Sequence, residues 1–122
     1  MTYVHIDETS VSRLLRELGD DVPAGVRFLT DFVIAWEGRV ARLLDAAERQ
    51  DPEDVMTVLL SVRTASGMLG ATALFSAASD LQRQVVDTRQ VDGPTVRRFV
   101  QVGTATCLEL LDLAHRLESA PA

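Results

Sequence analysis

DPEDVMTVLLSVRTASGMLGA, residues 51–71, contains the start and the end of one helix. Asp51 is a typical N-cap residue and Pro52 suits the first helical position. Acidic residues follow in the first turn, where they interact favourably with the helix dipole. Gly70 is the expected breaker at the other end. The stretch predicts a helix that runs from about residue 52 to residue 69.

One face of this predicted helix is apolar. At about 100° per residue, the core-facing stripe consists of Val55, Val58, Val62, Ala65 and Leu69. Leu60 falls about 160° from Val62 on the same projection, on the opposite face. That face also carries Arg63, Thr64 and Gly67. An isolated exposed leucine is ordinary on a protein surface. Gly67, however, costs on the order of 1 kcal/mol relative to alanine in mid-helix, which hints that another group approaches closely there.

Four further helices are predicted along the 122 residues. The first spans about residues 8–18 and ends at Gly19, and the second spans about residues 23–49 and begins around Pro23. The fourth begins near Ala71 or Thr72, and the fifth opens at residues 92–94. Short connections between long amphipathic helices favour antiparallel neighbours. The sequence therefore predicts an all-α fold, an up-and-down antiparallel four-helix bundle with a short extra N-terminal helix. It forms one domain over residues 1–122, with its core at about 6–118.

Apolar residues recur every three or four positions in these segments, as amphipathic helices require. In the first segment the expected core residues are Val11, Leu14 and Leu15, and in the second they are Val26, Leu29, Phe32, Trp36, Val40, Leu43 and Ala47. In the fourth they are Leu74, Ala77, Ala78, Leu81 and Val85, and in the fifth they are Val96, Phe99, Val100, Gly103, Cys107, Leu110, Leu111, Ala114 and Leu117. Gly38 lies inside the second segment, and close packing of a neighbour is the expected reason.

Composition and charge exclude several classes of partner. The formal net charge is −6, all 12 basic residues are arginine, and no basic run could follow a nucleic-acid backbone. No apolar run approaches the roughly 20 residues of a membrane span. The N-terminus lacks the pattern of a signal peptide, so a cytoplasmic location is expected. The single cysteine, Cys107, and two distant histidines do not form a metal-ligand set, and no cofactor is expected.

Residues 60–71, LSVRTASGMLGA, resemble the motif of the histidine phosphotransfer (Hpt) domain family, His-x-Leu-Lys-Gly-Ser-Ser-x-x-Leu-Gly-Ala. The final Leu69-Gly70-Ala71 matches this motif directly. Residues 28–44 resemble the family's second helix. Downstream, the pattern Leu-x-x-x-Cys-x-x-Leu-Glu is met in register by Leu74, Ala78, Leu81 and Gln82. The resemblance covers about residues 6–115.

The resemblance implies a four-helix bundle in which one exposed histidine relays a phosphoryl group between response-regulator receiver domains. Here Leu60 occupies the position of that histidine, and a leucine has no nucleophilic atom. Arg63 keeps the positive charge of the family's lysine, and Thr64 replaces its glycine. The resemblance therefore predicts a binding module, not an enzyme. Its partner would be a receiver domain or a sensor kinase, which docks on Leu60, Arg63, Thr64 and Gly67 without phosphotransfer. Gly70 and Ala71 would form the structural corner.

Two alternatives remain open. Phosphotransfer could use another acceptor, either His5, in an N-terminal extension that would hold it poorly, or His115, near the end of the last helix. Both are more typical of plain exposed histidines, and the hydroxyl groups of Ser61 and Ser66 would need a kinase rather than a receiver. The other alternative is a structural role, in which the Leu60 face is buried in a homodimer.

Overall fold

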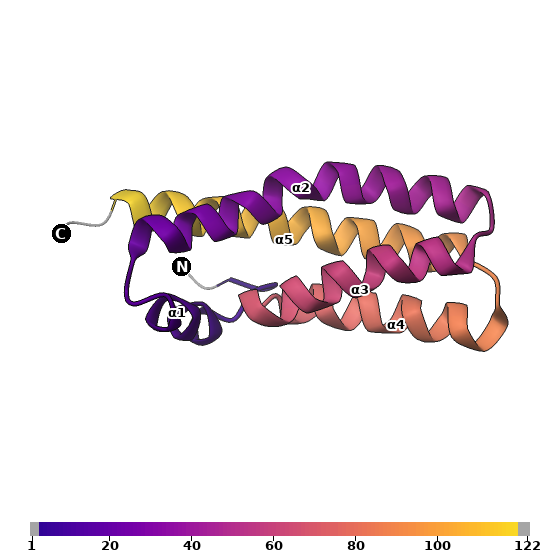
Figure 1. Cartoon of the computed structure of the whole chain (residues 1–122), viewed down its shortest axis with the longest axis horizontal. Helices are drawn as coiled ribbons and strands as arrows, with labels where there is room; N and C mark the ends of the chain where they lie inside the picture. The colour runs from indigo at the N-terminus through magenta and orange to yellow at the C-terminus, as the bar shows by residue number, and fades with distance from the viewer. Residues whose placement is uncertain (1–2, 120–122) are drawn as a thin grey trace.

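The computed structural model describes residues 3–119, which form five helices and no strand. They are α1 (Glu8–Glu17), α2 (Val22–Glu48), α3 (Pro52–Leu69), α4 (Thr72–Thr88) and α5 (Gly93–Ser119). The four long helices run up and down in an antiparallel bundle, and α1 lies across the end at which α3 finishes (Figure 1). The predicted fold class, including the short extra helix, is confirmed.

Each long helix packs against two others. Helix α2 contacts α3 and α5, and α4 contacts the same two helices, so the bundle has the cyclic order α2–α3–α4–α5. Helix α1 packs on α3 and α2. The largest fully buried side chains come from all four long helices and include Leu29, Leu43, Val62, Leu81, Phe99 and Leu110. One continuous core therefore fills the bundle.

The helix boundaries follow from local capping. The Asp51 carboxylate accepts a hydrogen bond from the backbone N–H of Asp54 at 3.1 Å, and Pro52 begins α3 as predicted. Asp7, Asp21 and Asp92 accept equivalent bonds at the starts of α1, α2 and α5. At its other end α3 stops at Gly70, which has φ +67° in the left-handed region.

The buried faces differ in part from the predicted stripes. Leu59 and Ser66 of α3 are fully or almost fully buried, whereas Ala65 is only partly buried. Since α1, α2 and α4 all contact α3, its buried face is wider than one stripe. In α5, Leu113 and Thr106 are buried and Leu111 is 44% exposed, which corrects the prediction for Leu111.

The other stripes are closer to expectation. The buried residues of α4 are the five that were predicted. Most predicted residues of α1, α2 and α5 are also buried, but Leu15, Val40, Ala47, Val100 and Leu117 are partly buried at the edge of the core. In α2, Gly25 and Ala46 are buried instead.

The expectation for Gly38 is wrong. Gly38 is exposed, and a Cβ placed on it would meet no atom within 4 Å. Close approach occurs instead at Gly25, which Leu15 of α1 contacts, and at Gly103, on which the Trp36 ring lies. These two glycines let α1 and α5 approach α2 closely.

None of the helices described, within residues 3–119, is both long and apolar enough to cross a bilayer.

Candidate functional site

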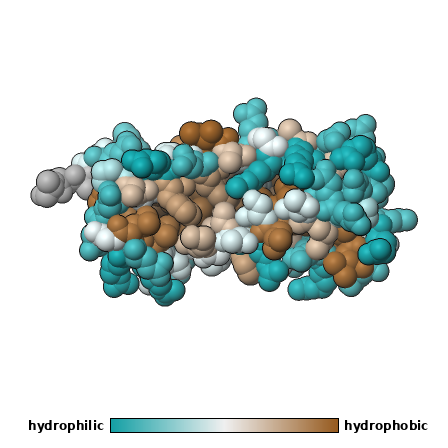
Figure 2. Space-filling view, in the orientation of Figure 1, coloured by the Kyte–Doolittle hydropathy of each residue, from teal (hydrophilic) through white to brown (hydrophobic). Residues whose placement is uncertain are grey.

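An open groove of about 400 Å³ lies where α3 faces α4. Its lining consists of Leu60, Arg63, Thr64, Gly67, Met68 and Phe75. The four residues singled out from the α3 sequence thus line one groove. On the face shown in Figure 2, apolar residues form separate patches among hydrophilic ones, so apolar surface here is local rather than continuous.

Leu60 and Val62 show how α3 positions the groove. Val62 is fully buried, and Leu60, two residues earlier, is 61% exposed. Thr64 lies one turn after Leu60, and its hydroxyl donates to the Leu60 carbonyl at 2.9 Å. The Thr64 hydroxyl proton is therefore used within the helix. Leu60 therefore adds a largely exposed aliphatic side chain to the groove.

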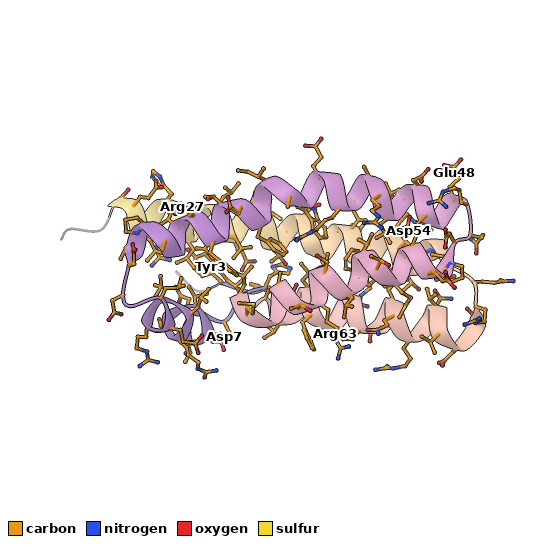
Figure 3. All side chains as sticks on the ribbon, viewed as in Figure 1. Tyr3, Asp7, Arg27, Glu48, Asp54 and Arg63 are labelled. Atoms are coloured by element: carbon orange, nitrogen blue, oxygen red, sulfur yellow. The ribbon has the colours of Figure 1, made fainter. Side chains whose placement is uncertain are left out.

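Arg63 is held at the boundary between the two helices. Its guanidinium carbon lies 5.0 Å from the centroid of the Phe75 ring, and Nη1 donates to Oε1 of Gln82 at 3.2 Å. Figure 3 shows Arg63 on the side of α3 that faces α4, away from α2. Both contacts are with α4, so the positive charge is fixed beside the groove. A contact of this cation–π type is worth about 0.5–1 kcal/mol at an exposed site.

Gly67 is exposed and lines the groove. A Cβ at this position would lie 3.7 Å from Cδ2 and Cε2 of Phe75, which is ordinary van der Waals contact. The packing of this chain therefore does not require a glycine, and no group of residues 3–119 makes the close approach that its presence in mid-helix suggests.

Met68 and Phe75 belong to the groove but were not predicted. Met68 is 50% exposed on the last turn of α3, and Phe75 is partly buried near the start of α4. Phe75 lies outside the buried stripe of α4, and an aromatic residue next to the Gly70 corner was the available signal. Sequence alone does not reveal that its ring lies beside Arg63 and Gly67, because this depends on how α4 packs on α3.

Gly70 and Ala71 form a tight corner between α3 and α4. The Gly70 carbonyl accepts a hydrogen bond from the Asp7 N–H at 2.8 Å, and the Ala71 N–H donates to the Ser66 carbonyl at 2.9 Å. A Cβ on Gly70 would lie 2.5 Å from Cβ of Ser10 and 2.9 Å from the Asp7 carbonyl oxygen. Ala71 is fully buried. The corner thus also fixes the start of α1.

The N-terminal extension holds His5 firmly, contrary to the expectation. Tyr3 and Ile6 are buried, and the Tyr3 hydroxyl bonds to Asp112 at 2.7 Å. The His5 N–H donates to Oε1 of Glu109 at 2.9 Å, and the ring Nδ1 contacts Oε2 of the same carboxylate. Burial alone would raise the pKa of Glu109, but the hydrogen bonds from His5 bring it below its usual value. Two buried neighbours thus anchor a segment that sequence alone suggested was loose.

Neither histidine lies in the groove. His5 is partly buried against α5, and His115 is exposed near the end of that helix, whereas α3 and α4 form the groove. Of the two serines in the Hpt-like motif, Ser61 is exposed and Ser66 is fully buried. Burial raises the pKa of the Cys107 thiol to about 11, so this thiol stays protonated at neutral pH. Within residues 3–119, no group of three or more histidine, cysteine or acidic residues could hold a metal ion.

The sequence and the structure were each compared with known proteins. No protein-family model and no curated protein matches the sequence. The structure is similar to the crystal structure of the HPT domain from an Hpt sensor hybrid histidine kinase of Shewanella, with a TM-score of 0.75. The similarity covers 95% of this chain and 97% of that domain at 12% sequence identity. The chain therefore has the fold of a histidine phosphotransfer domain.

Proposed function

We propose that this chain is an Hpt-family module of phosphorelay signalling that binds receiver domains through the α3–α4 groove without relaying phosphate. The observation that carries the proposal is the position of Leu60. The motif resemblance aligns it with the acceptor histidine, it is 61% exposed, and it lines the groove with Arg63 and Thr64. The docking surface is retained and the reactive group is replaced.

The composition of the groove suits a protein–protein contact. Leu60, Met68 and Phe75 provide apolar and aromatic surface, and Arg63 provides a fixed charge at its edge. Interface cores are typically rich in methionine, aromatic residues and arginine. Gly67 leaves room for a partner group to approach the α3 backbone. A partner that docks here would bury an exposed leucine that otherwise contacts water.

The groove contains no group that could accept a phosphoryl group from an aspartyl phosphate. Acceptance requires a free lone pair on a nucleophile. The Arg63 guanidinium has no such lone pair. The Thr64 hydroxyl is bonded to the Leu60 carbonyl and has no adjacent base among the groove residues. A receiver bound here would keep its phosphate, and the module would compete with active relay proteins for that receiver in the cytoplasm.

Titration of purified receiver domains from the source organism tests docking. We expect one or more to bind with a Kd on the order of micromolar. Leu60→Asp should weaken this binding by more than about tenfold, because a carboxylate would be buried in an apolar contact. Ile34→Asp is the matched control, since Ile34 is 76% exposed on α2. It should leave binding unchanged.

Four results would contradict the proposal. Docking is excluded if no receiver binds in the micromolar range, or if Leu60→Asp and Ile34→Asp weaken binding equally. A wild-type protein that sediments as a dimer, and a Leu60→Asp variant that sediments as a monomer, would assign the Leu60 face to a homodimer. Incubation with a phosphorylated receiver should leave the intact mass unchanged, and a phosphoryl group on His5 or His115 would show that another acceptor is used.

A further inference from the structure

A second hollow adjoins the groove on the side of α1. It has a volume of about 160 Å³ and is lined by Ser10, Arg13, Leu14, Glu17, Gly67 and Met68. Gly67 and Met68 line both hollows, so the surface is continuous from α4 across α3 to α1. From this continuity we infer that the partner of the groove also contacts α1, and that Arg13 helps to determine which partner binds. The inference rests on the proposed docking function.

Gly67 lies at the junction of the two hollows. Glycine costs on the order of 1 kcal/mol relative to alanine in a helix. Since a Cβ would fit at 3.7 Å from Phe75, packing within residues 3–119 gives no reason for that cost. The exposed backbone at Gly67 is accessible from both the α1 side and the α4 side. A partner side chain that spans the two hollows would lie directly on it.

Met68 is the other shared residue and is 50% exposed. Its unbranched thioether side chain adapts to the shape of a bound group at low cost. Together with Leu14 of α1, the side chains of Leu60, Met68 and Phe75 form the apolar part of the combined surface. The partner should therefore present an apolar group at its centre.

The charged residues of the combined surface indicate which groups should surround the partner's apolar centre. Arg63 lies on the α4 side and Arg13 on the α1 side, and neither pairs with a carboxylate within residues 3–119. The combined surface has these two arginines and one acidic residue, Glu17, whereas the whole chain has a net charge of −6. It is thus locally basic on an acidic protein. The fitting partner is a receiver surface with carboxylates on both sides of an apolar residue.

Helix α1 is held in place before any partner binds. The Asp7 N–H donates to the Gly70 carbonyl at 2.8 Å, and Ser10 packs against the Gly70 backbone. At the other side of α1, Leu15 packs on Gly25 of α2. Both hollows are therefore parts of one preformed surface, which lowers the entropic cost of binding.

The test uses the receiver that binds the wild-type protein. Arg13→Glu should weaken binding by about tenfold, and the effect should shrink as salt is raised, because the contact is electrostatic and at the rim. Arg98→Glu makes the same charge change at an exposed position of α5, a helix that lines neither hollow, and should have little effect. Gly67→Ala should raise the melting temperature and weaken binding.

The outcomes separate the inference from the proposed function. If Leu60→Asp abolishes binding but Arg13→Glu behaves like Arg98→Glu, the partner is confined to the α3–α4 groove, and the inference is wrong while docking stands. Wild-type affinity of Gly67→Ala would exclude a partner group at the junction and would also contradict the inference. If no receiver binds the wild-type protein, both fail. Weakening by both Leu60→Asp and Arg13→Glu supports both.

Discussion

Leu60 and Val62 are two residues apart and have opposite environments, because successive residues of a helix turn by about 100°. Val62 is fully buried and Leu60 is 61% exposed. This rule, applied to the sequence alone, places Leu60, Arg63, Thr64 and Gly67 on one face, and the structure brings all four into one groove. The resemblance to the Hpt motif, also read from the sequence alone, predicts that Leu60 stands at the acceptor position.

Other residues of the site depend on contacts that no local pattern contains. Phe75 belongs to another helix, and its place beside Arg63 depends on the packing of α4 on α3. His5 and Glu109 are 104 positions apart in the sequence, so their contact could not be predicted from spacing. Ser66 is buried although it lies outside the predicted stripe, because three helices contact α3.

Asp51 provides a prediction about pH. Hydrogen bonds from the Asp54 N–H and from the Arg49 side chain lower the pKa of Asp51 below its ordinary value of 3.8. A carboxyl group whose pKa is lowered by folding stabilises the folded state above its unfolded pKa, and the contribution is lost as the pH falls through the folded pKa. Asparagine caps helices equally well but does not ionise.

The free energy of unfolding, measured by urea denaturation from pH 7 to pH 3, should therefore fall less steeply in Asp51→Asn than in the wild-type protein near and below pH 4. The two proteins should differ most at neutral pH, where the wild-type carboxylate is ionised and bonded to Arg49. Parallel curves over the whole range would show that Asp51 is not coupled to folding.

At the scale of elements, the ends of α3 were predictable because capping is local. An Asp-Pro pair followed by acidic residues begins α3, and Gly70 ends it in the left-handed conformation. The role of Gly70 in attaching α1 was not predictable, because it depends on Asp7 and Ser10, which are distant in the sequence. For Gly38 the sequence suggested a close neighbour, but within the described residues no atom lies within 4 Å of a Cβ built there.

These two glycines form a matched pair for mutation. Gly70→Ala should lower the free energy of unfolding by at least about 2 kcal/mol, because alanine is strained at φ +67° and its Cβ would collide with Ser10 and Asp7. Gly38→Ala should raise it by up to about 1 kcal/mol through helix propensity alone. Thermal or urea denaturation checks both. A Gly70→Ala variant as stable as the wild-type protein would mean that the corner does not hold α1.

At the scale of the whole molecule, the four-helix bundle followed from helix lengths and short connections. The up-and-down path of the chain and the antiparallel directions of successive helices could be predicted from these two features. The width of each buried face was not, since it depends on how many neighbours a helix has. Leu111 was predicted in the core and is 44% exposed, and Leu113 is buried instead. A small error in the rotation of one helix explains this exchange.

The whole-molecule proposal is that this fold retains the docking geometry of a phosphotransfer domain and lacks only its nucleophile. A histidine at position 60 would be exposed, and it would lie beside the fixed charge of Arg63. Its imidazole lone pair could attack the aspartyl phosphate of a docked receiver, so that a P–N bond forms as the P–O bond to the aspartate breaks.

The most direct test is to incubate Leu60→His with a phosphorylated receiver that binds the wild-type protein, and to measure the intact mass and the site of modification. The wild-type protein and an Ile34→His variant are the controls. We expect an acid-labile phosphoryl group on residue 60 of Leu60→His and none on either control. A receiver that binds Leu60→His but leaves residue 60 unmodified would contradict the assignment of this position as the lost acceptor.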